Sequence, residues 1–138
     1  MTPGLEALGR QATACAHWRW LPGMAVADAY GVCGVGRGHV VDITAPPRFP
    51  GAWLANHSGV AWLSAEEMSR CLPDLSDPLT VQALLLLVRE AWATETAWVE
   101  PGHDGLWEMC VYVNGKCQML ASYQAEVEAL VAALEAAP

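Results

Sequence analysis

The stretch VYVNGKCQML, residues 111–120, constrains the fold of this chain more than any other part of the sequence. Asn114-Gly115 is the residue pair that type I′ turns prefer, because both central residues of that turn need a positive φ. Residues that favour strands flank the pair on both sides. The sequence therefore predicts a β-hairpin with strands at about 106–113 and 116–121.

A second strong pattern predicts a long helix from Pro78 to about Ala93. Asp77 is a typical N-cap, and proline is favoured at the first helical position. Apolar residues cover most sides of this helix, so we expect it to be buried. Weaker patterns predict a helix at 3–16, a strand at 18–21, a glycine-rich hairpin or bulged strand pair at 30–43, short strands at 52–56 and 59–63, a brief helix that starts at the Ser64–Glu67 capping box, and a last helix at 123–136 capped by Ser122.

This order of elements predicts an α+β fold, with a small antiparallel sheet and a C-terminal β-hairpin packed against three to four helices. The chain has 138 residues, so we expect a single domain over residues 1–138. Hydrophobic residues make up 54% of the chain and charged residues 16%. A chain of this length and composition can bury a core without metal or disulfide cross-links.

The charge pattern excludes several classes of partner. The net charge is −8, and the seven basic residues are scattered singly, whereas a duplex-binding protein needs them concentrated. Residues 1–10 lack the pattern of a signal peptide, and the most apolar run, residues 81–88, is too short to span a membrane. We therefore expect a cytoplasmic protein with neither a nucleic-acid nor a membrane partner.

The sequence carries no signature of a metal, a cofactor or a catalytic centre. The four histidines are dispersed, with no i, i+4 pair, and the five cysteines have no CxxC spacing. The glycines at 34–38 do not match the GxGxxG pattern of a dinucleotide site, because the third glycine is misplaced. We expect no metal, no cofactor and no catalytic residues, and so a protein that is not an enzyme.

Two of the cysteines share one face of the predicted hairpin. In its register Tyr112 faces Cys117 and Cys110 faces Met119, so the two thiols lie on a diagonal. A disulfide needs close β-carbons, and a reducing compartment opposes it. We expect two thiols packed near Tyr112, and the sequence leaves open whether they ever pair.

Seven tryptophans make the chain unusually rich in indole. In the strand predicted at 18–21, alternation puts Trp18 and Trp20 on one face and His17 and Arg19 on the other. Either the tryptophans anchor the core and Arg19 is left to contact a ligand, or the indoles line a pocket. Arginine can hold an anion, and an indole can stack on a nucleobase. The tryptophans expected in the core are Trp62, Trp92 and Trp107. The candidate ligand-binding residues are Arg19, Arg37, His39, Arg48, Trp18, Trp20 and Trp53.

Three stretches carry a family resemblance: HWRWLPGM at 17–24, LPDLSDPLTVQALLLLVREAW at 72–92 and EVEALVAALEAAP at 126–138. Together they resemble uncharacterised small accessory proteins of tailed phages and prophages. In those proteins a W-R-W-x-P-G-M start is joined to D-L-x-D-P-x-T-x-x-x-L-L-x-L-V-R-E-A-W and to a similar last helix. The resemblance implies a phage protein in the cytoplasm of an infected bacterium, and it carries over no functional residue.

Three functions are compatible with these features. The first is a phage-encoded host-defence inhibitor that binds and sequesters a small nucleotide-derived immune signal, with its site between the protomers of a homo-oligomer. The second is a protein–protein inhibitor or adaptor that acts on a host protein through exposed tryptophan and arginine. The third is a hydrolase that degrades the signal.

Overall fold

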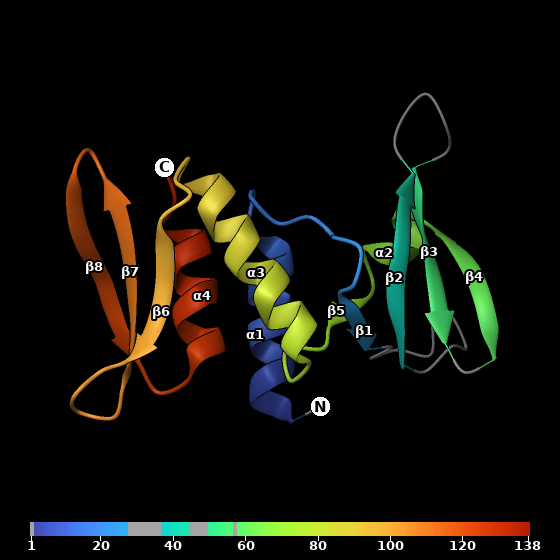
Figure 1. Cartoon of the computed structure of the whole chain (residues 1–138). Coiled ribbons are helices and arrows are strands. Elements are labelled where there is room, and N and C mark those ends of the chain that lie inside the picture. The colour runs from blue at the N-terminus through green and yellow to red at the C-terminus, as the bar shows by residue number, and fades with distance from the viewer. Residues whose placement is uncertain (1, 28–36, 45–49, 57) are drawn as a thin grey trace. The chain divides into compact units, whose positions relative to one another are not determined.

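A computed structural model describes residues 2–27, 37–44, 50–56 and 58–138 (Figure 1). Within these ranges it has four helices and two antiparallel sheets, which confirms the predicted α+β class. The helices are α1 (Pro3–Ala14), α2 (Ala65–Met68), α3 (Pro78–Ala91) and α4 (Glu126–Glu135). The strands are β1 (Ala25–Ala27), β2 (Arg37–Thr44), β3 (Gly51–Asn56), β4 (Gly59–Ser64), β5 (Leu72–Pro73), β6 (Ala97–Pro101), β7 (Trp107–Val113) and β8 (Lys116–Tyr123).

The chain groups into two compact units. The first comprises Met1–Thr13 and Arg19–Ala83, and the second comprises Ala14–Trp18 and Leu84–Pro138. Each unit holds one of the sheets, whereas the sequence suggested one small sheet. That the whole chain acts as one domain stays a prediction.

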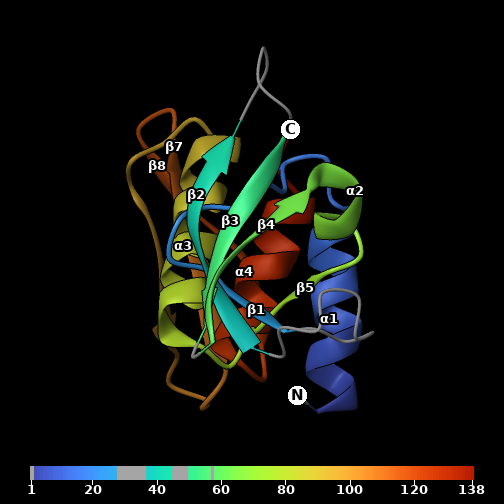
Figure 2. The ribbon, with the colours of Figure 1, turned by 90° about the vertical axis from the view of Figure 1, so that its right-hand side faces the viewer.

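The first unit is built on a sheet with the strand order β4-β3-β2-β1-β5 (Figure 2). One face of this sheet is apolar and buried, with side chains such as Val40, Leu54 and Leu63. The capping box predicted for α2 is present, because the Ser64 hydroxyl accepts a hydrogen bond from the Glu67 N–H and the Glu67 carboxylate accepts one from the Ser64 N–H. The predicted cap of α3 is also confirmed, since Asp77 Oδ2 accepts a hydrogen bond of 2.8 Å from the Thr80 N–H.

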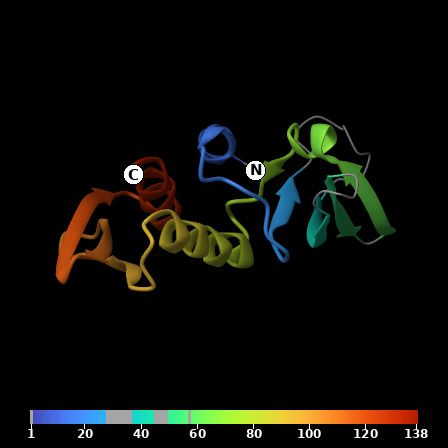
Figure 3. The same cartoon turned by 90° about the horizontal axis from the view of Figure 1, so that it is seen from above.

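The second unit is a three-stranded sheet, β6-β7-β8, with α4 packed along one face (Figure 3). The buried residues Met109 and Val111 of β7 lie in its core. The core side chains that α4 contributes are Val127, Leu130, Val131 and Leu134. Two side chains of the 84–92 segment add hydrogen bonds: the Arg89 guanidinium donates to the Ala97 carbonyl at 2.8 and 3.0 Å, and the Trp92 Nε1–H donates to the Ala133 carbonyl at 2.8 Å.

The predicted hairpin is the connection between β7 and β8. Asn114 and Gly115 have φ values of 52° and 76°, the signs that a type I′ turn requires. The expected pairs, Tyr112 with Cys117 and Cys110 with Met119, are confirmed by the register. A register shift between Met109 and Cys110 then displaces the remaining pairs by one residue, which the sequence did not reveal.

Two local predictions are wrong: the strand at 18–21 and the cap of the last helix. Residues 18–21 form no strand, because the Trp18 N–H donates to Cys15 at the end of α1 and the Met24 N–H donates to Leu21 in a tight turn. The Trp18 N–H and the Leu21 carbonyl are therefore engaged locally rather than in a ladder. Ser122 does not cap the last helix, because β8 extends through Tyr123. The N-cap of α4 is Ala125, whose N–H donates to the Glu128 carboxylate at 3.3 Å.

Candidate functional site

The face of the first sheet opposite its buried side is called here the outer face. Alternate residues of a strand share a face, so the register places Trp53, Ala55, Val60 and Trp62 together on it. Trp53 lies directly opposite Trp62, and Ala55 lies directly opposite Val60. The exposed fractions are 41% for Trp53, 39% for Trp62 and 62% for Val60. Two paired indoles and a neighbouring valine thus form an exposed apolar patch, which is the kind of surface that marks a binding site.

The Trp62 ring packs against the backbone of Gly51. A β-carbon built on Gly51 would lie 2.7 Å from Cζ2 of the Trp62 indole and would also collide with the Leu63 carbonyl. The ring therefore packs directly over the Gly51 backbone, in space that any larger residue would occupy. This cover fixes one side of the indole and leaves the other side to solvent.

A β-bulge in β2 sets the polar neighbour of the indoles. Val40 pairs with Leu54, but the next partner of β3, Trp53, pairs with Asp42, so Val41 is the extra residue. The bulge thereby puts a carboxylate directly opposite Trp53. The Asp42 Oδ1 atom accepts a hydrogen bond of 2.9 Å from the Ile43 N–H, which orients the carboxylate.

The other end of the outer face is charged. Arg37 and His39 precede the bulge on β2, and both face outward, since Gly38 and Val40 between and after them are buried. The Arg37 guanidinium is 3.1 Å from Asp74 Oδ2, and the His39 Nε2 atom is 3.8 Å from Asp77 Oδ1. The Arg37 side chain remains 71% exposed, whereas Asp74 is buried.

These carboxylates have further partners. Asp74 Oδ1 also accepts hydrogen bonds from the Ser76 hydroxyl and the Ser76 N–H, and Asp77 caps α3. Arg37 thus already has a carboxylate partner, and a protonated His39 would find one nearby. An incoming phosphate would compete with Asp74 for the Arg37 guanidinium.

The structure brings together three of the seven residues predicted to bind a ligand. Arg37, His39 and Trp53 share the outer face, and His39 pairs through Ala55 with the apolar patch. Arg48 lies outside the described residues. The other three residues lie in the irregular segment between α1 and β1, with no register position in either sheet: Trp18, Arg19 and Trp20.

Sequence reasoning missed Trp62. It was expected in the core, and this is wrong, because Trp62 faces outward beside Trp53. The signal was present in GVAWLS, where Trp62 has the same parity as Val60 and the opposite parity to the buried Leu63. Trp92 and Trp107, also expected in the core, are half-buried.

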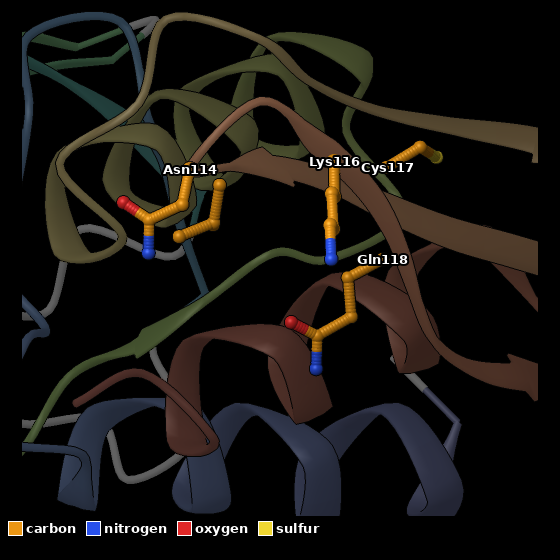
Figure 4. Close-up of a pocket in the computed structure, with 5 residues that line it drawn as sticks. Asn114, Lys116, Cys117 and Gln118 are labelled. Carbon is orange, nitrogen blue, oxygen red and sulfur yellow. The ribbon is translucent and has the colours of Figure 1, made fainter.

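A shallow open depression of about 520 Å³ lies at the turn of the β7–β8 hairpin (Figure 4). It is lined by Val113, Asn114, Lys116, Cys117 and Gln118. In the part of the chain that the structure describes, no group of three or more histidine, cysteine, aspartate or glutamate side chains could hold a metal ion. None of the described helices is long and apolar enough to cross a membrane.

No protein-family model, no curated protein and no solved structure matches this chain. The resemblance to tailed-phage accessory proteins therefore stays a prediction.

Proposed function

We propose that the chain is a binding protein that docks on a partner protein through the outer face of its first sheet. The observation that carries this proposal is the exposed pair Trp53–Trp62, with Val60 beside it. Tryptophan dominates the binding energy of many protein interfaces, because it buries a large area and loses little conformational entropy. The resemblance to phage accessory proteins supports a host protein, such as a component of antiviral defence, as the partner.

The charge of the chain narrows the chemistry of that partner. The net charge is −8, and Asp42 lies beside the indoles on the outer face. A partner with an apolar centre and a basic rim would complement this surface, and the rim would raise the association rate at low salt. The partner would cover the indoles and offer an arginine or lysine to Asp42.

The test is affinity capture from a host lysate followed by binding measurements with the purified partner. Trp53→Ala should weaken the Kd at least about tenfold, as expected for a central tryptophan. Val60→Glu should weaken it too, and this variant leaves Trp62 in place over Gly51. Tyr112→Ala is the matched control, because Tyr112 is 45% exposed but lies on the second sheet.

Unchanged binding of both Trp53→Ala and Val60→Glu, with native circular dichroism spectra, would rule the outer face out. A loss that is equal for Tyr112→Ala would mean that the effect is not specific to this surface.

A second candidate is sequestration of a small nucleotide-derived signal. It is favoured by one observation, namely that Arg37, His39 and Trp53 share the outer face. In a homo-oligomer, two such faces could enclose a ligand that stacks on Trp53 while Arg37 exchanges Asp74 for a phosphate. Calorimetric titration with cyclic dinucleotides, cyclic trinucleotides and cyclic ADP-ribose isomers tests it. Binding that Arg37→Ala abolishes would favour this candidate, and no heat with any of these ligands would dismiss it.

A further inference from the structure

The second sheet has a solvent-facing side of its own, opposite the side that α4 covers. The register and strand alternation place Cys110 and Tyr112 of β7 on this side, with Cys117 and Met119 of β8 as their direct partners. Cys110 is therefore diagonal to Cys117 across two neighbouring strands. On its other side Cys110 faces Trp98 of β6.

The Cys117 thiol lies close enough to Cys110 to affect its ionisation. Burial, and after it the neighbouring Cys117 thiol, raises the pKa of Cys110. Two cysteines on a diagonal of adjacent strands can form a disulfide once a shift of one strand brings their β-carbons together. No disulfide links the described cysteines, which are Cys15, Cys71, Cys110 and Cys117.

The two thiols differ in access. Cys117 is exposed and lies at the rim of the depression beside the turn, whereas Cys110 is buried. In Figure 4 the Cys117 side chain points away from those of Lys116 and Gln118, toward the opposite side of the strand. A small molecule can therefore reach Cys117 directly, whereas burial shields Cys110 from it.

We propose that Cys110 and Cys117 form a dithiol site that low-molecular-weight disulfides oxidise reversibly to a disulfide within the hairpin. In the first step the Cys117 thiolate attacks a disulfide RSSR, forms a mixed disulfide and releases one RSH. In the second step Cys110 loses its proton and attacks the Cys117 sulfur, which releases the second RSH. The protein dithiol loses two electrons and two protons, and RSSR is reduced to two RSH.

Closure requires a movement of the backbone, and two features of the hairpin favour one. A disulfide needs β-carbons about 3.5–4.5 Å apart, and diagonal neighbours in a sheet lie somewhat farther from each other. The register shift between Met109 and Cys110 increases the local twist beside one of the two cysteines. β8 is an edge strand of its sheet, so it can move toward β7 without breaking a second ladder.

The position of Lys116 gives a direct assay. Trypsin cleaves after Arg89 and Lys116, so Cys110 falls in the peptide 90–116 and Cys117 in the peptide 117–138. The full chain is equilibrated with mixtures of glutathione and glutathione disulfide, quenched with acid, alkylated and digested. Mass spectrometry should show the two peptides joined in the oxidising mixtures and separate after reduction.

Single cysteine variants distinguish the thiol that reacts first, Cys117, from the thiol that resolves the mixed disulfide, Cys110. In Cys110→Ser, Cys117 should keep one bound glutathione, because the thiol that releases it is gone. In Cys117→Ser, Cys110 should stay unmodified, because it is buried. Cys15→Ser is the matched control and should leave the link between the two peptides unchanged.

Three outcomes would overturn the proposal. One is wild-type protein in which Cys117 retains glutathione, which means that Cys110 does not resolve the mixed disulfide. Another is a link between Cys117 residues of two chains. The third is two free thiols in mixtures that oxidise dithiothreitol. The proposal does not depend on the outer face of the first sheet, so it stands or falls separately from the proposed function.

Discussion

Single residues decide how the apolar patch is presented. Gly51 leaves room for one side of the Trp62 ring, so that only the other side of the ring is exposed. The β-bulge at Val41 likewise decides that an aspartate, and not a valine, lies opposite Trp53. Both effects act through one position each, so both can be tested by substitution.

Replacing Gly51 with alanine should destabilise the protein by about 1–3 kcal/mol, the range typical of overpacked sites. The added methyl group would occupy the space of the Trp62 ring and approach the Leu63 carbonyl. Urea denaturation measures the free energy of unfolding, and tryptophan fluorescence should show Trp62 moving further into solvent. Gly9→Ala is the control, because a β-carbon there would make contacts of 3.6 Å, which are ordinary van der Waals distances. Equal stabilities of the two variants would contradict the packing of Trp62 on Gly51.

At the scale of elements, local chemistry explains which parts of the fold could be predicted. The turn at Asn114-Gly115, the cap at Asp77 and the capping box at Ser64 each use side chains or φ values that neighbouring residues determine. The strand expected at 18–21 failed because tertiary partners, and not alternation, decide where a ladder forms. β6, AWVEP, was missed for the same reason, since a five-residue edge strand with a proline has little pattern of its own.

The hairpin turn predicts that alanine substitution lowers stability at Gly115 but not at Gly4. Gly115→Ala should cost roughly 1–2 kcal/mol, because an alanine is strained at a φ of 76°. Gly4→Ala in α1 should be neutral or stabilising by up to about 1 kcal/mol, since a β-carbon there meets no atom and alanine favours helices. Thermal unfolding of the two variants measures both effects. A Gly115→Ala protein as stable as wild type would show that the turn tolerates another conformation.

The cap of α2 predicts a pH dependence. Hydrogen bonds from the Ser64 backbone and hydroxyl lower the pKa of Glu67 below its ordinary value. A carboxylate with a lowered folded-state pKa stabilises the fold above its unfolded-state pKa, and this stabilisation is lost as the pH falls through the folded-state pKa. Glu67→Gln keeps an acceptor for the Ser64 N–H but does not titrate. The stability advantage of wild type over Glu67→Gln should therefore be present at neutral pH and vanish in acid, as followed by urea titrations across the acid range. A difference that does not change with pH would contradict the role of the carboxylate charge.

At the scale of the whole molecule, the sequence identifies single candidate residues of the outer face but not the contacts between distant segments that bring them together. Arg37, His39 and Trp53 were named as separate candidates from their side-chain chemistry, and their common face depends on the pairing of β2 with β3, which has no local signature. The partners Asp74 and Asp77 come from a different segment, so the neutralisation of Arg37 could not be foreseen. The division of the strands into two sheets, one in each compact unit, likewise has no signature in successive windows of the sequence.

The excess of acidic residues predicts the solution behaviour of the chain. The isoelectric point from the sequence is about 4.8, so the net negative charge disappears as the pH approaches that value. Without mutual repulsion, molecules with an exposed indole pair should associate through it. Light scattering should rise near this pH, and it should rise less for Trp53→Ala. Equal scattering by the two proteins would mean that another surface mediates the association.

The direct opposition of Trp53 and Trp62 across β3 and β4 has an optical consequence. Two neighbouring indoles can couple their electronic transitions, which would add a paired positive and negative band to the far-ultraviolet circular dichroism spectrum. This couplet would be superimposed on the signal of the helices and would depend on the register of one strand pair. A partner that tilts either ring would change the couplet, so binding could be followed without an attached dye.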